Sequence, residues 1–162
     1  MTQNQTDTTP MPVSALLLGV AGLIPFFGLA LWQGRVSDEL LADRLILAYI
    51  FYAASILSFL GGIGWGLAIS EQDPMQRGLS FSMSTLPSLV GWAAAFINVQ
   101  NLAFSLAILG MGFVLQGIWD FYLVRNNRAP RWFGTLRMGL TLAVLASMTL
   151  LWFTQNDFSA LA

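Results

Sequence analysis

The sequence predicts an all-α integral membrane protein, folded as an antiparallel bundle of five transmembrane helices. Of its 162 residues, 56% are hydrophobic and only 9% are charged, whereas a soluble domain carries about 25% charged residues. The mean hydropathy is +0.68. Five apolar runs are each long enough for the hydrocarbon core of a bilayer, which takes about 20 helical residues to cross. A chain with so little charge cannot cover its own surface in water, so we exclude a soluble fold.

The five predicted spans are residues 13–32, 45–69, 79–97, 102–124 and 132–153. The second span is longer than a bilayer requires at about 1.5 Å per residue, so we expect it to tilt or to extend beyond the membrane. Short links make consecutive helices antiparallel neighbours. Residues 1–12 are predicted to be a disordered N-terminal tail without the features of a secretory signal, and residues 154–162 a short C-terminal tail.

The arginines predict the orientation, because loops on the cytoplasmic side of a membrane carry an excess of basic residues. With five spans, the N-terminus shares its side of the membrane with the second and fourth connections. That side holds Arg77, Arg125, Arg128 and Arg131, and the other side holds Arg35 and Arg44. We therefore predict a multi-pass protein of the cell inner membrane, with the N-terminus inside and the C-terminus outside.

The residue types that are missing exclude several functions. The chain has no His and no Cys, and all seven of its basic residues are arginines. It therefore offers no thiolate nucleophile, disulfide, imidazole base or cysteine–histidine zinc site. A net charge of −1 argues against nucleic-acid binding. We predict no enzymatic activity, no cofactor and no metal, since no activated nucleophile or near-neutral general base is evident.

Two charged residues fall inside predicted spans, where a charge at mid-helix costs roughly 2.5–3.5 kcal/mol. Asp120 lies five positions before Arg125, about 7 Å inside the boundary at helical rise. Arg137 lies about as far in from the start of the next span. Both residues are on the same side of a helical hairpin, so they can pair. The alternative is that Arg137 reaches back to the interface and Asp120 is hydrated near the loop.

Other polar and aromatic residues fall at the same depth and predict a pocket in the inner half of the bundle. Convergent polar groups in an apolar setting are typical of a binding site. The candidate ligand-binding residues are Trp65, Ser84, Thr85, Gln116, Asp120 and Arg137. The alternative is purely structural, with Trp65 filling the core and the ion pair joining the last two spans.

Small residues and prolines predict where helices pack closely or bend. Ser58, Gly62 and Gly66 form a ridge at four-residue spacing, which lets helix backbones approach each other. Pro87 removes a backbone donor in the third span, so we expect a kink there. The residues assigned to packing or kinks are Gly22, Pro25, Ser58, Gly61, Gly62, Gly66 and Pro87.

Several stretches of the chain resemble a known family. They are GLIPF at 22–26, YAASILSFLGG at 52–62 with WG at 65–66, LPSL at 86–89, Asp120, and Trp132 followed by LR at 136–137 and LT at 140–141. These stretches resemble a family of small bacterial membrane proteins of unknown function, related to the mitochondrial transmembrane protein 69. The resemblance implies a bacterial inner-membrane protein or its mitochondrial counterpart, and no established activity.

Three functions are compatible with the sequence. The first is a non-enzymatic protein that binds a small lipophilic or amphipathic ligand in the cytoplasmic half of the bundle. The second is an accessory or assembly subunit of a larger membrane complex, for which the lateral helix faces are the available contact surface. The third is a small proton-coupled transporter, since an intramembrane carboxylate can relay protons. The expected partners are the lipid bilayer, a lipophilic small molecule, and a membrane-protein partner or a second copy of the chain.

Overall fold

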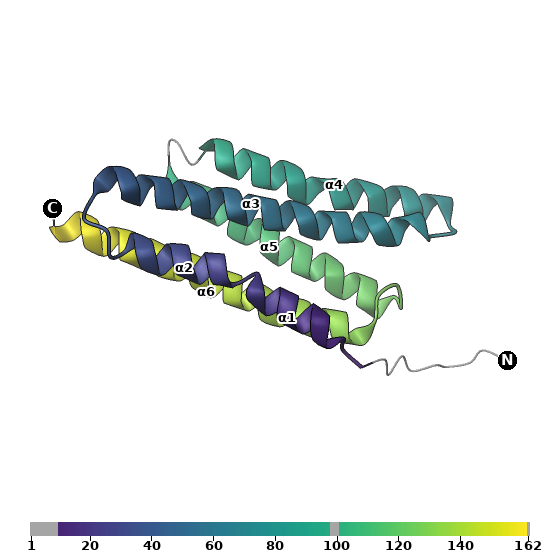
Figure 1. The fold of residues 1–162 in the computed structure, drawn as a ribbon. Coiled ribbons are helices and arrows are strands. Elements are labelled where there is room, and N and C mark those ends of the chain that lie inside the picture. Colours follow the sequence, from purple (N-terminus) through teal and green to yellow (C-terminus); the bar gives the residue numbers. More distant parts are fainter. Residues whose placement is uncertain (1–9, 98–100, 162) are drawn as a thin grey trace.

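The computed structural model describes residues 10–97 and 101–161 of the chain, with side chains up to Gln155. Within these residues the fold is entirely helical (Figure 1). The helices are α1 (Val13–Ala21), α2 (Ile24–Gln33), α3 (Glu39–Ile69), α4 (Pro74–Ile97), α5 (Leu102–Arg125) and α6 (Arg131–Leu161).

The prediction of five membrane spans is confirmed. Five helical segments are long and apolar enough to cross a membrane, and α1 and α2 together form the first of them. Two helices are longer than the apolar runs. The α3 helix begins at Glu39, six residues before the run, because the Asp38 side chain caps it by accepting a hydrogen bond from the Leu41 amide at 3.0 Å. The α6 helix continues through the region predicted as a C-terminal tail. Residues 1–9 of the predicted N-terminal tail, and residues 98–100 of the short link between the third and fourth predicted spans, lie outside the described residues.

The first span is broken in the middle, between α1 and α2 (Figure 1). Pro25 explains the break, because a proline ring clashes with the carbonyl four residues earlier, here that of Ala21, and has no amide to donate. Gly22 ends α1, and its carbonyl accepts a hydrogen bond from the Tyr52 hydroxyl at 2.9 Å. Gly22 and Pro25 therefore separate two helices within one span. The α2 helix packs on both α3 and α6, whereas α1 packs mainly on α6.

A close helix contact joins α3 to α4, and of its two glycines Gly61 was among the predicted packing residues and Gly64 was not. A Cβ on Gly61 would lie 2.4 Å from the Ser84 carbonyl oxygen, and one on Gly64 would lie 2.6 Å from the Ser84 hydroxyl. Gly62 and Gly66 have nothing within 4 Å of the same position. Gly62 and Gly66 therefore take no part in the α3–α4 contact, and their packing role stays a prediction.

Pro87 lies in the same α3–α4 contact. It is buried, and its ring carbon Cγ would be 3.3 Å from a Cβ on Gly61. The α4 helix continues through Pro87 to Ile97. Ser58, one turn before Gly61, shares a hydrogen bond of 2.9 Å with the Ser88 hydroxyl. Ser58 and Gly61 on α3 and Pro87 on α4 therefore all contribute to the contact between these two helices.

An arginine joins two loops at one end of the bundle. Arg128, in the link between α5 and α6, forms an ion pair with Glu71, in the link between α3 and α4. Its guanidinium also donates to the Gln76 side chain, and to the Ser80 hydroxyl at 3.4 Å. The two connections that an odd number of spans places on the same side of the membrane are thus in contact.

Candidate ligand-binding site

A buried ion pair connects α5 to α6. The Arg137 Nε atom donates to the Asp120 Oδ2 atom at 2.7 Å, and the two side chains are 7% and 2% exposed. The pairing that the sequence made available is therefore present. Snorkelling of Arg137 to the interface, the alternative interpretation, is not observed.

The second carboxylate oxygen of Asp120 is also satisfied. It accepts a hydrogen bond of 2.9 Å from the Gln116 side chain, one helical turn earlier on α5. Four-residue spacing places both residues on the same face of α5, toward α6. Gln116 and Asp120 thus form a small polar layer with Arg137 inside an apolar bundle. Each oxygen of the carboxylate has a donor, as a buried carboxylate requires.

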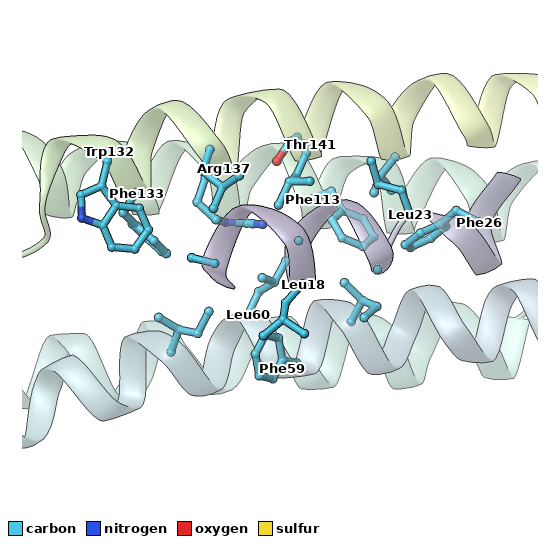
Figure 2. A pocket seen from close by; sticks show the side chains of 18 residues that line it. Leu18, Leu23, Phe26, Phe59, Leu60, Phe113, Trp132, Phe133, Arg137 and Thr141 are labelled. Carbon is cyan, nitrogen blue, oxygen red and sulfur yellow. The ribbon is translucent and has the colours of Figure 1, made fainter. Parts of the chain in front are cut away.

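A cavity of about 390 Å³ lies beside this layer, between the first span, α3 and α6. Figure 2 shows the side chains around it, with Trp132 and Phe133 at one end and Leu23 and Phe26 at the other. Its volume is within the range of roughly 300–1,000 Å³ that is typical of small-molecule pockets. The lining residues are Ala15, Leu18, Gly19, Gly22, Leu23, Phe26, Ile56, Phe59, Leu60, Ile63, Phe113, Trp132, Phe133, Leu136, Arg137, Leu140, Thr141 and Val144.

Arg137 is the link between the polar layer and the cavity. Its side chain reaches from α6 into the middle of the set of lining residues (Figure 2). The guanidinium nitrogen Nη2 is buried and has no hydrogen-bond partner in the described part of the chain. A buried donor left without an acceptor costs about 1–3 kcal/mol, and more when the group is charged. A side chain that lines the otherwise apolar cavity therefore carries an unsatisfied donor.

Thr141 also lines the cavity, one helical turn after Arg137, but its hydroxyl points elsewhere. The Thr141 oxygen would lie 3.6 Å from a Cβ on Gly117, and so it faces α5. This oxygen is likewise buried without a partner among the described residues. Thr141 therefore places a second unsatisfied group at the α5–α6 contact.

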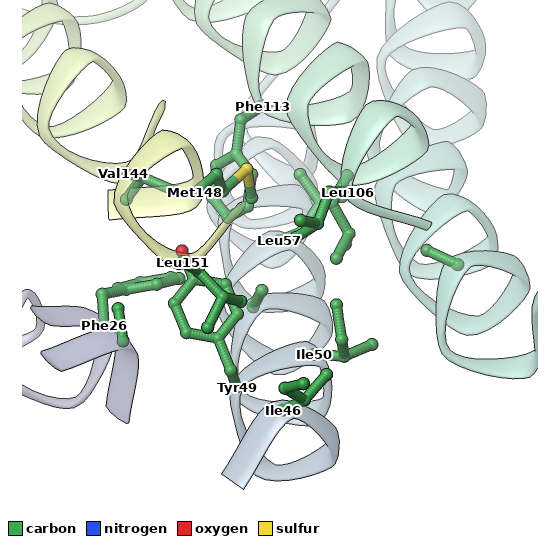
Figure 3. Close-up of a cluster of buried hydrophobic side chains, with 14 of the residues drawn as sticks. Phe26, Ile46, Tyr49, Ile50, Leu57, Leu106, Phe113, Val144, Met148 and Leu151 are labelled. Carbon is green, nitrogen blue, oxygen red and sulfur yellow. The ribbon is translucent and has the colours of Figure 1, made fainter. Parts of the chain in front are cut away.

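The hydrophobic core closes the end of the cavity that is farther from Trp132 and Phe133. Phe26 and Phe113 line the cavity and are each 1% exposed. Their rings are 6.2 Å apart in an edge-to-face arrangement, and Phe26 makes a similar contact with Tyr49 at 5.5 Å. Figure 3 shows these residues with Val144, Met148 and Leu151 in one cluster. A molecule in the cavity would therefore end against a close-packed aromatic wall.

The flank of the cavity opens toward the surrounding bilayer. Leu18 on α1 and Phe59 on α3 both line it, and they are 74% and 65% exposed. Since α1 packs mainly on α6, its side toward α3 is left uncovered. A lipophilic molecule could thus enter sideways from the hydrocarbon region without passing through water.

Two of the predicted site residues lie away from the ion pair and the cavity. Trp65 is 47% exposed and packs against Phe81 on α4, with ring centroids 4.7 Å apart. Thr85 is exposed, and its hydroxyl donates to the Phe81 carbonyl at 2.9 Å. Trp65 follows Gly64 on α3, and since successive helical residues are about 100° apart, the inward direction of Gly64 turns Trp65 outward. Trp65, a candidate ligand-binding residue, is therefore not part of the cavity wall.

Ser84 is buried, but it lies between α3 and α4. Its hydroxyl donates to the Ser80 carbonyl at 2.7 Å. Near Gly64, this hydroxyl and the Trp119 ring nitrogen both face α3, and that nitrogen is buried without a partner in the residues that the structure covers. Of the six predicted residues, the structure thus joins Gln116, Asp120 and Arg137, and it leaves Trp65, Ser84 and Thr85 on the α3–α4 side.

The first span contributes a wall of the cavity that the sequence prediction did not include. Ala15, Leu18 and Gly19 on α1 line it. The signal that could have indicated them is the Gly22–Pro25 break, which turns α1 away from α2. The shape of the cavity depends on how α1 is placed after this break, and the polarity of single residues does not predict that placement.

Membrane-crossing helices around a buried ion pair define the class of this molecule, a multi-pass helical membrane protein. The chain belongs to the family described as "Protein of unknown function (DUF3429)", whose family model matches residues 11–153. The resemblance stated from the sequence is thereby confirmed.

The chain is also similar to transmembrane protein 69 of two vertebrates. It is 37% identical to the protein from Xenopus tropicalis over 140 residues, which is 85% of this chain and 53% of that protein. It is 31% identical to the protein from Mus musculus over 149 residues, which is 91% of this chain and 58% of that protein. The chain thus spans a little over half the length of these relatives. No solved structure matches the chain.

Proposed function

We propose that this protein binds a lipophilic or amphipathic molecule from the bilayer in the cavity beside Arg137. The observation that carries the proposal is the buried Nη2 atom of Arg137, which has no partner in the part of the chain described and belongs to a side chain that lines the apolar cavity. Buried polar groups in folded proteins are nearly always hydrogen-bonded, so each exception asks for an explanation. A bound molecule with an acceptor would supply the missing bond.

The rest of the cavity supports this proposal. Its wall is apolar apart from Arg137, its inner end is closed by Phe26 and Phe113, and its flank is open beside Leu18 and Phe59. This combination suits a molecule that is already dissolved in the membrane. Binding of this kind requires no catalytic group.

The location and orientation are parts of the same proposal. We place the chain in the cell inner membrane, with its N-terminus and the Arg128–Glu71 contact on the cytoplasmic side. The supporting observation is that the two connections joined by this contact are those that carry most of the arginines. The cavity then lies in the cytoplasmic half of the bundle, because Trp132 and Phe133 stand at the start of α6.

Filling the cavity provides the test. Ala15 lines the cavity, whereas Val20, on the same helix, does not line it and is 51% exposed. We expect the purified wild-type protein to carry one amphipathic molecule per chain in native mass spectrometry. The Ala15→Trp variant should lose it, and the matched Val20→Trp variant should keep it.

Two outcomes would overturn the proposal. One is a wild-type protein that carries no such molecule. The other is equal retention by the two tryptophan variants, which would place the molecule elsewhere on the protein. Purification of an empty protein together with a second membrane protein would favour the accessory-subunit alternative.

A further inference from the structure

The ion pair and hydrogen bonds around Arg137 restrict the kind of head group that the cavity can accept. The positive charge of Arg137 is already matched by Asp120 through the Nε–Oδ2 contact of 2.7 Å. The Asp120 Oδ1 atom is occupied by Gln116. The three side chains together therefore carry no net charge, and the Nη2 atom keeps its N–H donors without a partner among the described residues.

An anionic head group would be poorly accommodated here. Among the lining residues Arg137 is charged, and the others are uncharged. A second negative charge beside Arg137 would have to share one guanidinium with Asp120. Transferring an unpaired charge into a site of this kind costs far more than one hydrogen bond returns.

A cationic head group would be excluded for a different reason. An arginine side chain is a donor without acceptor capacity. An ammonium group would lie beside the positively charged guanidinium, and no lining residue of the cavity carries a negative charge to pair with it. An uncharged oxygen, as in an ester, ketone, amide or alcohol, satisfies the donor and adds no charge.

We infer that the cavity beside Arg137 binds an uncharged amphiphile whose oxygen accepts a hydrogen bond from the Arg137 Nη2 atom and whose apolar tail leaves the bundle between Leu18 and Phe59. This inference rests on the proposed function and deepens it. It specifies a neutral acceptor at the head and a hydrocarbon tail continuous with the bilayer. Free fatty acid anions, lipid sulfates and quaternary amines are the molecules that the site rejects.

Three photoreactive probes test the inference directly. Each carries the same straight alkyl chain with a diazirine close to the head group, the part that the inference places in the cavity. The head groups are a methyl ester, a sulfonate and a trimethylammonium. A sulfonate is chosen because it remains ionised at any pH at which the protein is studied. The protein in lipid nanodiscs is irradiated with each probe, and the labelled peptides are identified by mass spectrometry.

We expect the ester to label peptides from α1, α3 and α6 about tenfold or more over the sulfonate, and a tenfold ratio corresponds to about 1.4 kcal/mol of binding free energy. The ammonium probe should label the same peptides no better than the sulfonate. Equal or stronger labelling by a charged probe would overturn the inference and leave the proposed function standing. Labelling of the cavity by none of the probes would overturn both.

A conservative variant separates the donor from the charge. Arg137→Lys keeps a positive charge beside Asp120 but replaces the planar fork of donors with a single compact ammonium. We expect this variant to retain the thermal stability of the folded protein better than Arg137→Gln, and to lose the preference for the ester. An unchanged preference in Arg137→Lys would contradict the role of Nη2. The comparison of probes on the wild-type protein decides the matter where a variant fails to fold.

Discussion

Asp120 and Arg137 are each costly to bury alone, and the structure places them so that each reduces the cost of the other. The ion pair is 2.7 Å long, and the carboxylate is 2% exposed. Removing one partner of a buried pair leaves an uncompensated charge, which typically destabilises a protein by about 3–5 kcal/mol. The α5–α6 hairpin therefore depends on both residues, because removal of either one would leave the other as an unpaired charge in the interior.

We expect Asp120→Asn to lower the free energy of unfolding by about 3–5 kcal/mol, because it leaves the Arg137 guanidinium charged and unpaired in the interior. The double variant Asp120→Asn with Arg137→Gln should recover much of this loss, since it removes both charges. Denaturation in detergent, followed by circular dichroism, measures both. Asp43→Asn is the control, because Asp43 is exposed. A single variant as stable as the wild-type protein would show that the ion pair has no structural importance.

Thr141 leads to the opposite expectation. Its hydroxyl is buried and has no partner in the residues described, so Thr141→Val, which has nearly the same shape, removes an unsatisfied group. We expect stability to be unchanged or to rise by up to about 1–3 kcal/mol. Thr149→Val is the matched control, because the Thr149 hydroxyl is exposed and donates to the Leu145 carbonyl at 2.9 Å. A clear loss of stability in Thr141→Val alone would show that this hydroxyl has a partner in the membrane.

At the scale of helices, the α3–α4 contact depends on the absence of side chains at particular positions. Gly61 lies against the backbone of α4, and the atom it would meet, a carbonyl oxygen, cannot rotate away as a side-chain end can. The neighbouring Gly62 faces open space. Of these two adjacent glycines, only Gly61 is required for the close approach of α3 and α4.

We expect Gly61→Ala to destabilise the protein by about 1–3 kcal/mol, as overpacking of a well-packed contact does. Its Cβ would lie 2.4 Å from the Ser84 carbonyl oxygen, so α3 and α4 would have to separate. Gly62→Ala should be neutral or slightly stabilising, because alanine favours the helix by up to about 1 kcal/mol over glycine. Thermal unfolding of the two variants in the same detergent measures the difference. Equal stabilities would show that the helices do not approach each other at Gly61.

Gly61 and Gly62 also show which features of the fold can be predicted from the sequence and which cannot. The length and hydropathy of each apolar run predict the spans, and the cost of intramembrane charge singles out Asp120 and Arg137. The rotation of α3 about its axis is harder to predict, because a helix surrounded by lipid is apolar on every face and its pattern has no polar side to mark the outside. An error of one residue, or about 100°, exchanges Gly61 for Gly62 and turns Trp65 from the lipid to the interior.

The cavity was beyond prediction for a different reason. It exists because the break at Gly22–Pro25 leaves α1 on α6 and away from α3. Its lining residues come from helices far apart in the sequence. A proline indicates that a helix is interrupted, but the direction of the next segment is set by tertiary packing.

At the scale of the whole molecule, the arrangement separates a closed part from an open one. The core around Phe26, Tyr49 and Leu57 is almost completely buried. The half of the bundle that contains the ion pair holds the cavity and the flank beside α1. The Arg128–Glu71 contact joins the loops at that same end, and the cavity has its open flank at the side of the bundle, beside Leu18 and Phe59.

The orientation in the membrane is the last prediction, and the absence of cysteine from the chain makes it easy to test. Gln72, in the link between α3 and α4, and Ser37, in the link between α2 and α3, are both exposed. Connections at opposite ends of α3 must lie on opposite sides of the membrane. Since the arginine-rich connections belong in the cytoplasm, we expect Ser37→Cys to react with a membrane-impermeant maleimide added to intact bacterial spheroplasts. Gln72→Cys should react only after the cells are opened, and the reverse pattern would place the cavity in the outer half of the membrane.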